Sequence, residues 1–195
     1  MGGTFDPIHM GHLVCAEQAR DALELDGVIF MPAGNPVFKK HIEVSDAHHR
    51  VAMCRAAIED NPAFDVSTLE VDRAGDTYTV DTLEALRAHY PENVELYFIA
   101  GADAILTLPQ WRDAPRLARL ASFVGLNRPR SASLQSPQIA KKLAGTGFRT
   151  LFVEAPLFEL SSSDIRKRIL GNRSVRYLIP PAVLEYIESV GLYGD

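Results

Sequence analysis

Short apolar runs alternate with longer stretches of helical periodicity along most of the chain. Four runs are uniformly apolar and end near a glycine or proline, which is typical of strands buried on both faces. They cover residues 28–31, 96–100, 123–126 and 151–153. Five other stretches repeat apolar residues every three or four positions, which predicts helices over residues 13–25, 45–58, 79–90, 163–170 and 180–190. This alternation predicts an α/β fold with a doubly wound parallel sheet.

The chain length sets the domain organisation. With 195 residues it is long enough for one α/β domain and short for two, so we expect a single domain over residues 1–195. Helices from about residue 161 would complete that domain, and Ser45 is expected to cap the helix over 45–58. The Ser- and Gln-rich stretch over 131–138 indicates an exposed loop and not a domain boundary.

The start of the chain departs from the pattern of such folds. A glycine-rich turn at Gly2 and Gly3 should follow a strand, but only Met1 stands before it. The first strand is therefore expected to be either very short or truncated at Met1, and we favour truncation, with residues upstream of Met1.

Composition and charge narrow the class of protein. Acidic residues outnumber basic ones 25 to 20, and the net charge of −5 argues against a dedicated binder of duplex nucleic acid. No apolar run approaches the roughly 20 residues of a membrane span, and no secretory leader is visible. Cys15 and Cys54 are too few for a disulfide framework or a zinc site. We expect a cytoplasmic protein without a prosthetic group, nucleic-acid partner or membrane partner, and the sequence leaves homo-oligomerisation open.

The first twelve residues carry the strongest chemical signal. Gly2 and Gly3 let the backbone turn tightly, and Pro7 stiffens the exit from that turn. A helix that begins near His9 would point its free N–H groups and positive dipole end at the turn, which makes an anion site. His9 and His12 lie one helical turn apart and share a face. An imidazole there can strengthen its hydrogen bond as charge builds on a reacting phosphorus.

A second motif, Ser161-Ser162-Ser163-Asp164-Ile165-Arg166, stands at the start of a predicted helix. Serines cap helix N-termini and offer hydroxyl groups to an anion. Arg166 falls about one turn into the helix, where its guanidinium could reach the same phosphates. Residues 161–176 carry five basic side chains and one acidic one. Alone, this pattern equally suits a capped surface helix, but beside the histidine motif it predicts the opposite wall of one phosphate site.

These two motifs together resemble the His-x-Gly-His nucleotidylyltransferase superfamily, and more specifically the nicotinate mononucleotide adenylyltransferases. Further matches run in order along nearly the whole chain. They are Asn35-Pro36-Val37-Phe38-Lys39, Thr77-Tyr78-Thr79-Val80-Asp81-Thr82-Leu83, Gly101-Ala102-Asp103, Pro109-Gln110-Trp111, Arg128-Pro129, Tyr177-Leu178-Ile179-Pro180 and Gly191-Leu192-Tyr193. The resemblance implies a Rossmann-like fold and the transfer of AMP from ATP to nicotinate mononucleotide, giving deamido-NAD and pyrophosphate in NAD biosynthesis.

The resemblance also implies roles for individual residues. The catalytic residues that hold the ATP phosphates would be His9, His12, Lys39 and Arg166. The ATP site would be lined by Gly2, Gly3, Thr4, Phe5, His9, Gly11, His12, Gly101, Asp103, Ser161, Ser162, Ser163, Ile165 and Arg166. The mononucleotide would meet Thr79, Asp103, Trp111 and Arg128. Asp103 would lie at the ribose, and the flat indole of Trp111 can stack on a pyridine ring.

The implied reaction is a direct in-line attack by a phosphate oxygen of the mononucleotide on the α-phosphorus of ATP. Alignment and charge neutralisation then supply the catalysis, and Mg²⁺ is expected to arrive on the triphosphate, with no metal site made by the protein. One position departs from the family pattern. Phe38 stands where the family often has a histidine, so one phosphate contact is expected to be absent or replaced by Lys40 or His41.

Other functions remain open from the sequence. They are an adenylyltransferase for nicotinamide mononucleotide or phosphopantetheine, a nucleotide-binding sensor without turnover, and an RNA-binding relative of class I tRNA synthetases. Residues 77–83 together with Trp111 argue against phosphopantetheine, and the small size and acidic charge argue against RNA. The intact set of predicted phosphate ligands argues against a sensor. The choice between nicotinate and nicotinamide depends on a positive field or backbone N–H groups that the sequence does not reveal.

Overall fold

The computed structural model describes residues 1–34, 44–127, 136–156 and 160–194. Its strands are β1 (Gly2–Gly3), β2 (Val28–Pro32), β3 (Phe64–Val66), β4 (Tyr97–Gly101), β5 (Ser122–Asn127) and β6 (Thr150–Glu154). Its α-helices are α1 (Met10–Ala22), α2 (Ala47–Ile58), α3 (Thr79–His89), α4 (Ala102–Leu106), α5 (Ala114–Leu117), α6 (Ser136–Leu143), α7 (Ser162–Leu170) and α8 (Pro181–Val190). A 3₁₀ turn, η2 (Leu108–Gln110), follows α4.

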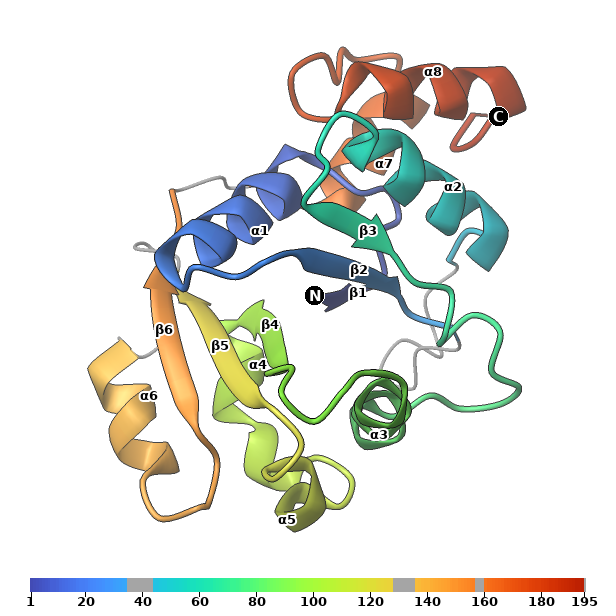
Figure 1. The fold of residues 1–195 in the computed structure, drawn as a ribbon. Coiled ribbons are helices and arrows are strands. Elements are labelled where there is room, and N and C mark those ends of the chain that lie inside the picture. Colours follow the sequence, from blue (N-terminus) through green and yellow to red (C-terminus); the bar gives the residue numbers. More distant parts are fainter. Residues whose placement is uncertain (35–43, 128–135, 157–159, 195) are drawn as a thin grey trace.

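Two parallel three-stranded sheets lie side by side, in the orders β1-β2-β3 and β4-β5-β6. Because β1 also contacts β4, the combined strand order is 3-2-1-4-5-6, with the order reversing at β1 and β4 (Figure 1). A doubly wound sheet binds its ligands at that reversal, beyond the carboxyl ends of the strands. The predicted fold class is confirmed.

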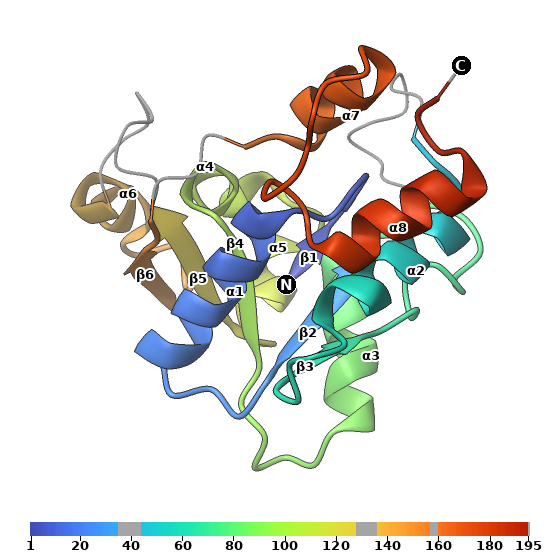
Figure 2. The same ribbon diagram turned by 90° about the horizontal axis from the view of Figure 1, so that it is seen from above.

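Helices cover both faces of this sheet, and each face has its own apolar core. One core includes Phe30, Met53 and Ile187 and joins α1, α2 and α8 to the sheet. The other includes Ile105 and Phe123 and joins α3, α4, α5 and α6 to the sheet. Figure 2 shows α8 lying along α2, far from α6. Because helices cover both faces of the sheet, the loops at the carboxyl ends of the strands are the expected place for a ligand site.

The first strand is present and very short. β1 pairs Gly2 with Met31 and Gly3 with Pro32, and the amino group of Met1 donates to the carbonyl oxygen of Ile29 at 2.7 Å. A cavity of about 700 Å³ is lined by Met1 and by the amino-terminal halves of β2 and β4. The two sheets therefore meet at β1, which consists of Gly2 and Gly3 and contacts β4.

The predicted elements are found, with some corrections. Asp46, not Ser45, caps α2, since its carboxylate accepts from the backbone N–H of His48 at 3.0 Å. Residues 136–138 belong to α6 and not to a loop, while 131–135 lie outside the described residues. The pattern also missed the eight-residue helix α6 and the shorter elements β3, α4, η2 and α5, which have three to five residues each. Runs of that length cannot display a helical or strand period.

Candidate active site

The loop between β1 and α1 is held by aromatic packing. A Cβ atom on Gly3 would lie 2.7 Å from the ring of Phe5, so this position requires glycine. Phe5 has a positive φ of 51° and is only 2% exposed. Its ring meets the imidazole of His12 edge to face, with 5.0 Å between centroids. The loop therefore approaches the first turn of α1 in one fixed conformation.

His9 and His12 lie on one face of the first turn, as predicted. Their rings stack with centroids 3.7 Å apart, and the backbone N–H of His9 donates to Nδ1 of His12 at 3.2 Å. This hydrogen bond makes Nδ1 the acceptor, so a neutral His12 carries its proton on Nε2. His12 is partly exposed, whereas His9 is 3% exposed. The pair thus prepares Nε2–H of His12 as a donor.

The two predicted motifs come together at the start of α7. Ser161 caps this helix by accepting from the backbone N–H of Asp164 at 3.1 Å. Ser162 donates from its hydroxyl to the carbonyl oxygen of Pro7 at 2.9 Å. Arg166 donates from Nη1 to the carbonyl oxygen of Asp6 at 2.6 Å and lies 3.7 Å from its carboxylate. The guanidinium predicted to face phosphates therefore lies beside the glycine-rich loop.

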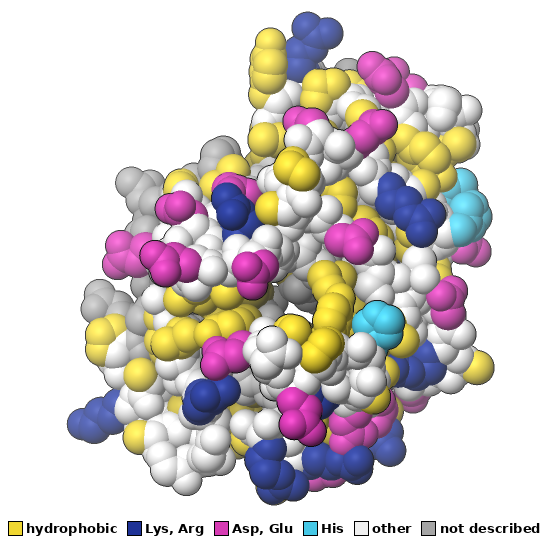
Figure 3. Space-filling view, in the orientation of Figure 1, with side chains coloured by type: hydrophobic (Ala, Val, Ile, Leu, Met, Phe, Trp, Pro, Cys, Tyr) yellow, Lys and Arg dark blue, Asp and Glu magenta, His cyan; other side chains and the backbone are white. Residues whose placement is uncertain are grey.

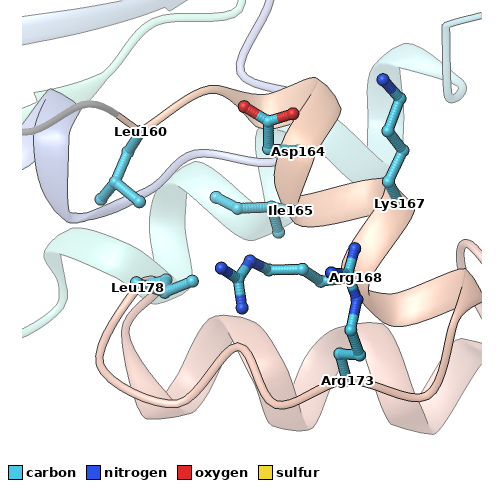
Figure 4. Close-up of a pocket in the computed structure, with 7 residues that line it drawn as sticks. All are labelled: Leu160, Asp164, Ile165, Lys167, Arg168, Arg173 and Leu178. Carbon is cyan, nitrogen blue, oxygen red and sulfur yellow. The ribbon is translucent and has the colours of Figure 1, made fainter.

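The opposite face of α7 lines a separate pocket of about 250 Å³ (Figure 4). It is formed by Leu160, Asp164, Ile165, Lys167, Arg168, Arg173 and Leu178. With about 100° per residue, Asp164 and Arg168 lie roughly 160° around the helix from Arg166. Ile165, predicted at the ATP site, is fully buried and belongs to the core. This pocket is thus distinct from the Arg166 side of the site.

Three residues with no predicted role hold the loop between β1 and α1 in place. Arg50 is 2% exposed and donates to the carbonyl oxygens of Thr4, Gly34 and Ser45 at 3.0, 3.4 and 2.9 Å. Asp6 is equally buried and accepts from the hydroxyl of Tyr193 at 2.6 Å. Burial and this hydrogen bond raise the pKa of the Tyr193 phenol, which stays a donor. Periodicity alone gives no signal for these contacts, because they join distant segments.

Three further predicted residues, Gly101, Asp103 and Trp111, lie on the segment that ends β4 and follows it. Gly101 is the N-cap of α4, and Asp103 lies in its first turn; both are exposed. Trp111 follows η2, and its Nε1–H donates to the hydroxyl of Thr107 at 2.9 Å. Thr79 begins α3. The indole is therefore held in a set orientation at the edge of this open region.

Arg112 also lies in this region, and the sequence did not predict a role for it. Its guanidinium carbon lies 4.2 Å from the ring centroid of Tyr78, the N-cap of α3. This cation–π contact joins the start of α3 to the segment after η2. It also brings a positive charge there. Thr79 itself lines the cavity beside Met1 and the amino-terminal halves of β2 and β4.

Some predictions lie outside the described residues. These are the roles of Lys39 and Arg128, and the contacts of Phe38, Lys40 and His41. Within the described ranges, no three His, Cys, Asp or Glu side chains are grouped so as to hold a metal ion. No described helix has the length and apolar character needed to cross a bilayer. Figure 3 shows acidic side chains interspersed with Lys and Arg on the face in view.

The fold and the site define a nucleotidylyltransferase class of protein: the chain belongs to the cytidylyltransferase-like family, whose family model matches residues 1–168. A relative from Roseiflexus sp. (strain RS-1), named "Probable nicotinate-nucleotide adenylyltransferase", is 45% identical over 193 residues, which are 99% of this chain and 96% of that protein. One of the same name from Corynebacterium jeikeium (strain K411) is 46% identical over 198 residues, with 99% and 98% covered. Within the family, the chain therefore belongs with the nicotinate-nucleotide adenylyltransferases.

Solved structures share the fold. The Plasmodium falciparum nicotinic acid mononucleotide adenylyltransferase complexed with NaAD has a TM-score of 0.77 and 21% sequence identity, covering 98% of this chain and 94% of that one. The same enzyme complexed with APC also has a TM-score of 0.77, at 22% identity and the same coverage.

Proposed function

We propose that this protein transfers AMP from ATP to nicotinate mononucleotide, releasing pyrophosphate and forming nicotinate adenine dinucleotide (deamido-NAD) for NAD biosynthesis. The observation that carries the proposal is the convergence of the His9–His12 pair and Arg166 on the two sides of one glycine-rich loop. Relatives about 45% identical over nearly the full chain carry the name of this activity. We further propose one catalytic unit over residues 1–195, since α7 contributes Arg166 and α8 packs on α2.

The phosphate end would act by alignment and charge neutralisation. A phosphate oxygen of nicotinate mononucleotide attacks the α-phosphorus of MgATP; a new O–P bond forms, the bond to the bridging oxygen breaks, and pyrophosphate leaves with the electron pair. Nε2–H of His12 donates to the α-phosphate, where negative charge accumulates in the transition state. Arg166 and Lys39 bind the departing phosphates. The attacking group is already an anion, so no protein nucleophile is needed.

The acceptor end would bind the mononucleotide in two ways: an aromatic side chain would stack on its ring, and positively charged groups would attract its carboxylate. The Trp111 indole stacks on the pyridine ring, and Asp103 accepts hydrogen bonds from a ribose. Backbone N–H groups at the start of α3, near Thr79, face the ring substituent together with the charge of Arg112. Arg128 contacts the mononucleotide phosphate. A carboxylate on the ring gains more from this field than a neutral amide, which favours nicotinate over nicotinamide.

The decisive experiment is pyrophosphate release with MgATP and one acceptor at a time: nicotinate mononucleotide, nicotinamide mononucleotide or phosphopantetheine. We expect fast release only with nicotinate mononucleotide. Equal or better turnover of nicotinamide mononucleotide would keep the chemistry and overturn the substrate. Release only with phosphopantetheine would overturn the acceptor class, and MgATP binding without any release would replace the enzyme with a nucleotide sensor.

A further inference from the structure

We propose that Tyr193, close to the carboxyl end of the chain, is a positioning residue that acts through Asp6 to aim Arg166 at the ATP phosphates. The proposal rests on the proposed function for the identity of the nucleotide. It deepens that function by adding a residue from the C-terminal turn that touches no substrate. The observation behind this proposal is the orientation of the buried Asp6 carboxylate.

The Asp6 carboxylate has a different partner on each oxygen. Oδ1 accepts from the Tyr193 hydroxyl at 2.6 Å. Oδ2 accepts from the backbone N–H of Ser45 at 3.2 Å and lies 3.7 Å from Nη1 of Arg166. The same Nη1 donates to the Asp6 carbonyl oxygen at 2.6 Å. Asp6 therefore holds Arg166 through its backbone oxygen, while its carboxylate stays at a longer distance.

The hydrogen bond from Tyr193 keeps the Asp6 carboxylate away from the Arg166 guanidinium. The Asp6 side chain is 3% exposed, so water cannot readily replace a lost partner on Oδ1. Without the tyrosine hydroxyl, the carboxylate gains by turning both oxygens toward the nearest cation, because a bidentate pair with a guanidinium is the strongest available contact. Arg166 would then be drawn into a closer ion pair with Asp6. Phosphate would have to compete with that pair for the guanidinium, whose side chain is 26% exposed.

The end of α8 places Tyr193 for this role. Gly191 adopts a left-handed φ of 67°, and the N–H of Leu192 donates to the carbonyl oxygen of Ile187 at 3.0 Å, as in a glycine-terminated helix. The chain then turns back, with Tyr193 itself at φ 63° and its hydroxyl 3.9 Å from the sulfur of Met53 on α2. Figure 2 shows this C-terminal turn beside the segment that leads into α2. The last turn of the chain thereby reaches the phosphate loop.

The test is Tyr193→Phe, which removes one hydroxyl and keeps the ring. We expect the Kd of MgATP, measured by calorimetry, and the KM for ATP to rise about tenfold, the size expected for a lost hydrogen bond to a charged group. The KM for nicotinate mononucleotide should change less than about twofold. Tyr97→Phe is the matched control, because its hydroxyl also donates to a carboxylate, that of Glu95 at 2.8 Å, at the exposed start of β4. The control should leave ATP affinity unchanged.

A double-mutant cycle with Asp6→Asn separates positioning from simple stabilisation. If Tyr193 acts through the carboxylate, its removal in the Asp6→Asn background should cost ATP affinity little more. Additive losses, or a fall in Tm with an unchanged Kd for MgATP, would overturn the proposal. The calorimetry needs no acceptor, so a protein that binds MgATP but does not use nicotinate mononucleotide would refute the proposed function and still test this one.

Discussion

The two ends of the proposed nucleotide site are built in different ways. At the proposed phosphate end, Asp6, His9 and Arg50 are each 2–3% exposed, and Asp6 and Arg50 are hydrogen-bonded to distant segments. At the proposed acceptor end, Gly101 and Asp103 are exposed, and the partly buried Trp111 is held by a hydrogen bond from its indole and by an edge-to-face contact with Phe98. The proposed phosphate end is therefore a pre-organised network, whereas the proposed acceptor end is more open.

This difference matches what each end has to do. Stabilising charge in a transition state requires donors that are fixed before the reaction, because reorienting them during the reaction would cost the energy they supply. Binding a flat ring depends mainly on contact area and tolerates small displacements. Loss of the His12 donor should therefore affect turnover, and changes around Arg166 should affect affinity for ATP. Changes at the acceptor end should affect affinity for the mononucleotide.

The largest effect is expected from His12→Ala. Losing one pre-organised donor to the α-phosphate should lower kcat about 10²–10³-fold, with little change in the KM for nicotinate mononucleotide. His89→Ala is the control, since that imidazole is exposed at the far end of α3. Steady-state kinetics of both variants measure the difference. An unchanged kcat in His12→Ala would show that this imidazole does not stabilise the transition state.

A smaller effect of the opposite kind is expected from Trp111→Ala. Aromatic stacking on a base contributes about 1–3 kcal/mol, so the KM for nicotinate mononucleotide should rise about tenfold or more. The KM for ATP should stay close to that of the unchanged protein. Trp111→Phe keeps an aromatic ring for stacking and for the contact with Phe98 but loses the hydrogen bond to Thr107, so it should recover most of the affinity. A fall in kcat without a change in KM would contradict the comparison.

The smallest effect is expected from Glu70→Gln, behind the acceptor end. Glu70 accepts from the Thr82 hydroxyl on α3 at 2.9 Å, and burial raises the pKa of its carboxyl. The folded protein therefore binds this proton more tightly than the unfolded chain, and the free energy of unfolding falls as pH rises from below 4.5 through the raised value. Glutamine avoids that loss and can still accept the hydroxyl.

Thermal unfolding across pH measures this effect. We expect the Tm of Glu70→Gln to exceed that of the unchanged protein by less than about 3 °C at neutral pH, and the difference to vanish in acid. Turnover should be unchanged, since the carboxyl touches no substrate. A lower Tm at neutral pH would mean that the charge of Glu70 contributes to stability through Arg73, which donates to the same hydroxyl at 3.0 Å.

Local sequence determined the fold class, the long helices and the histidine and serine motifs. Buried strands and amphipathic helices show a period within one element, and the His9–His12 and Ser161–Arg166 motifs each lie within a single turn region. Short elements such as α4 and α5 have too few residues for a period to show. The cap of α2 was misplaced by one residue, because Ser45 and Asp46 are both good caps and only one can stand at the helix boundary.

Only the tertiary structure decided how the loop between β1 and α1 is held. Arg50 follows its cap by four residues but binds carbonyl oxygens from three different segments, and Tyr193 meets Asp6 across 187 positions of the chain. A buried polar group must find a partner, yet its own sequence neighbourhood does not say which distant group will supply it. The reactive side chains of the site can thus be found from local motifs. Their exact placement depends on contacts between the first and last segments of the chain, which form only in the folded protein.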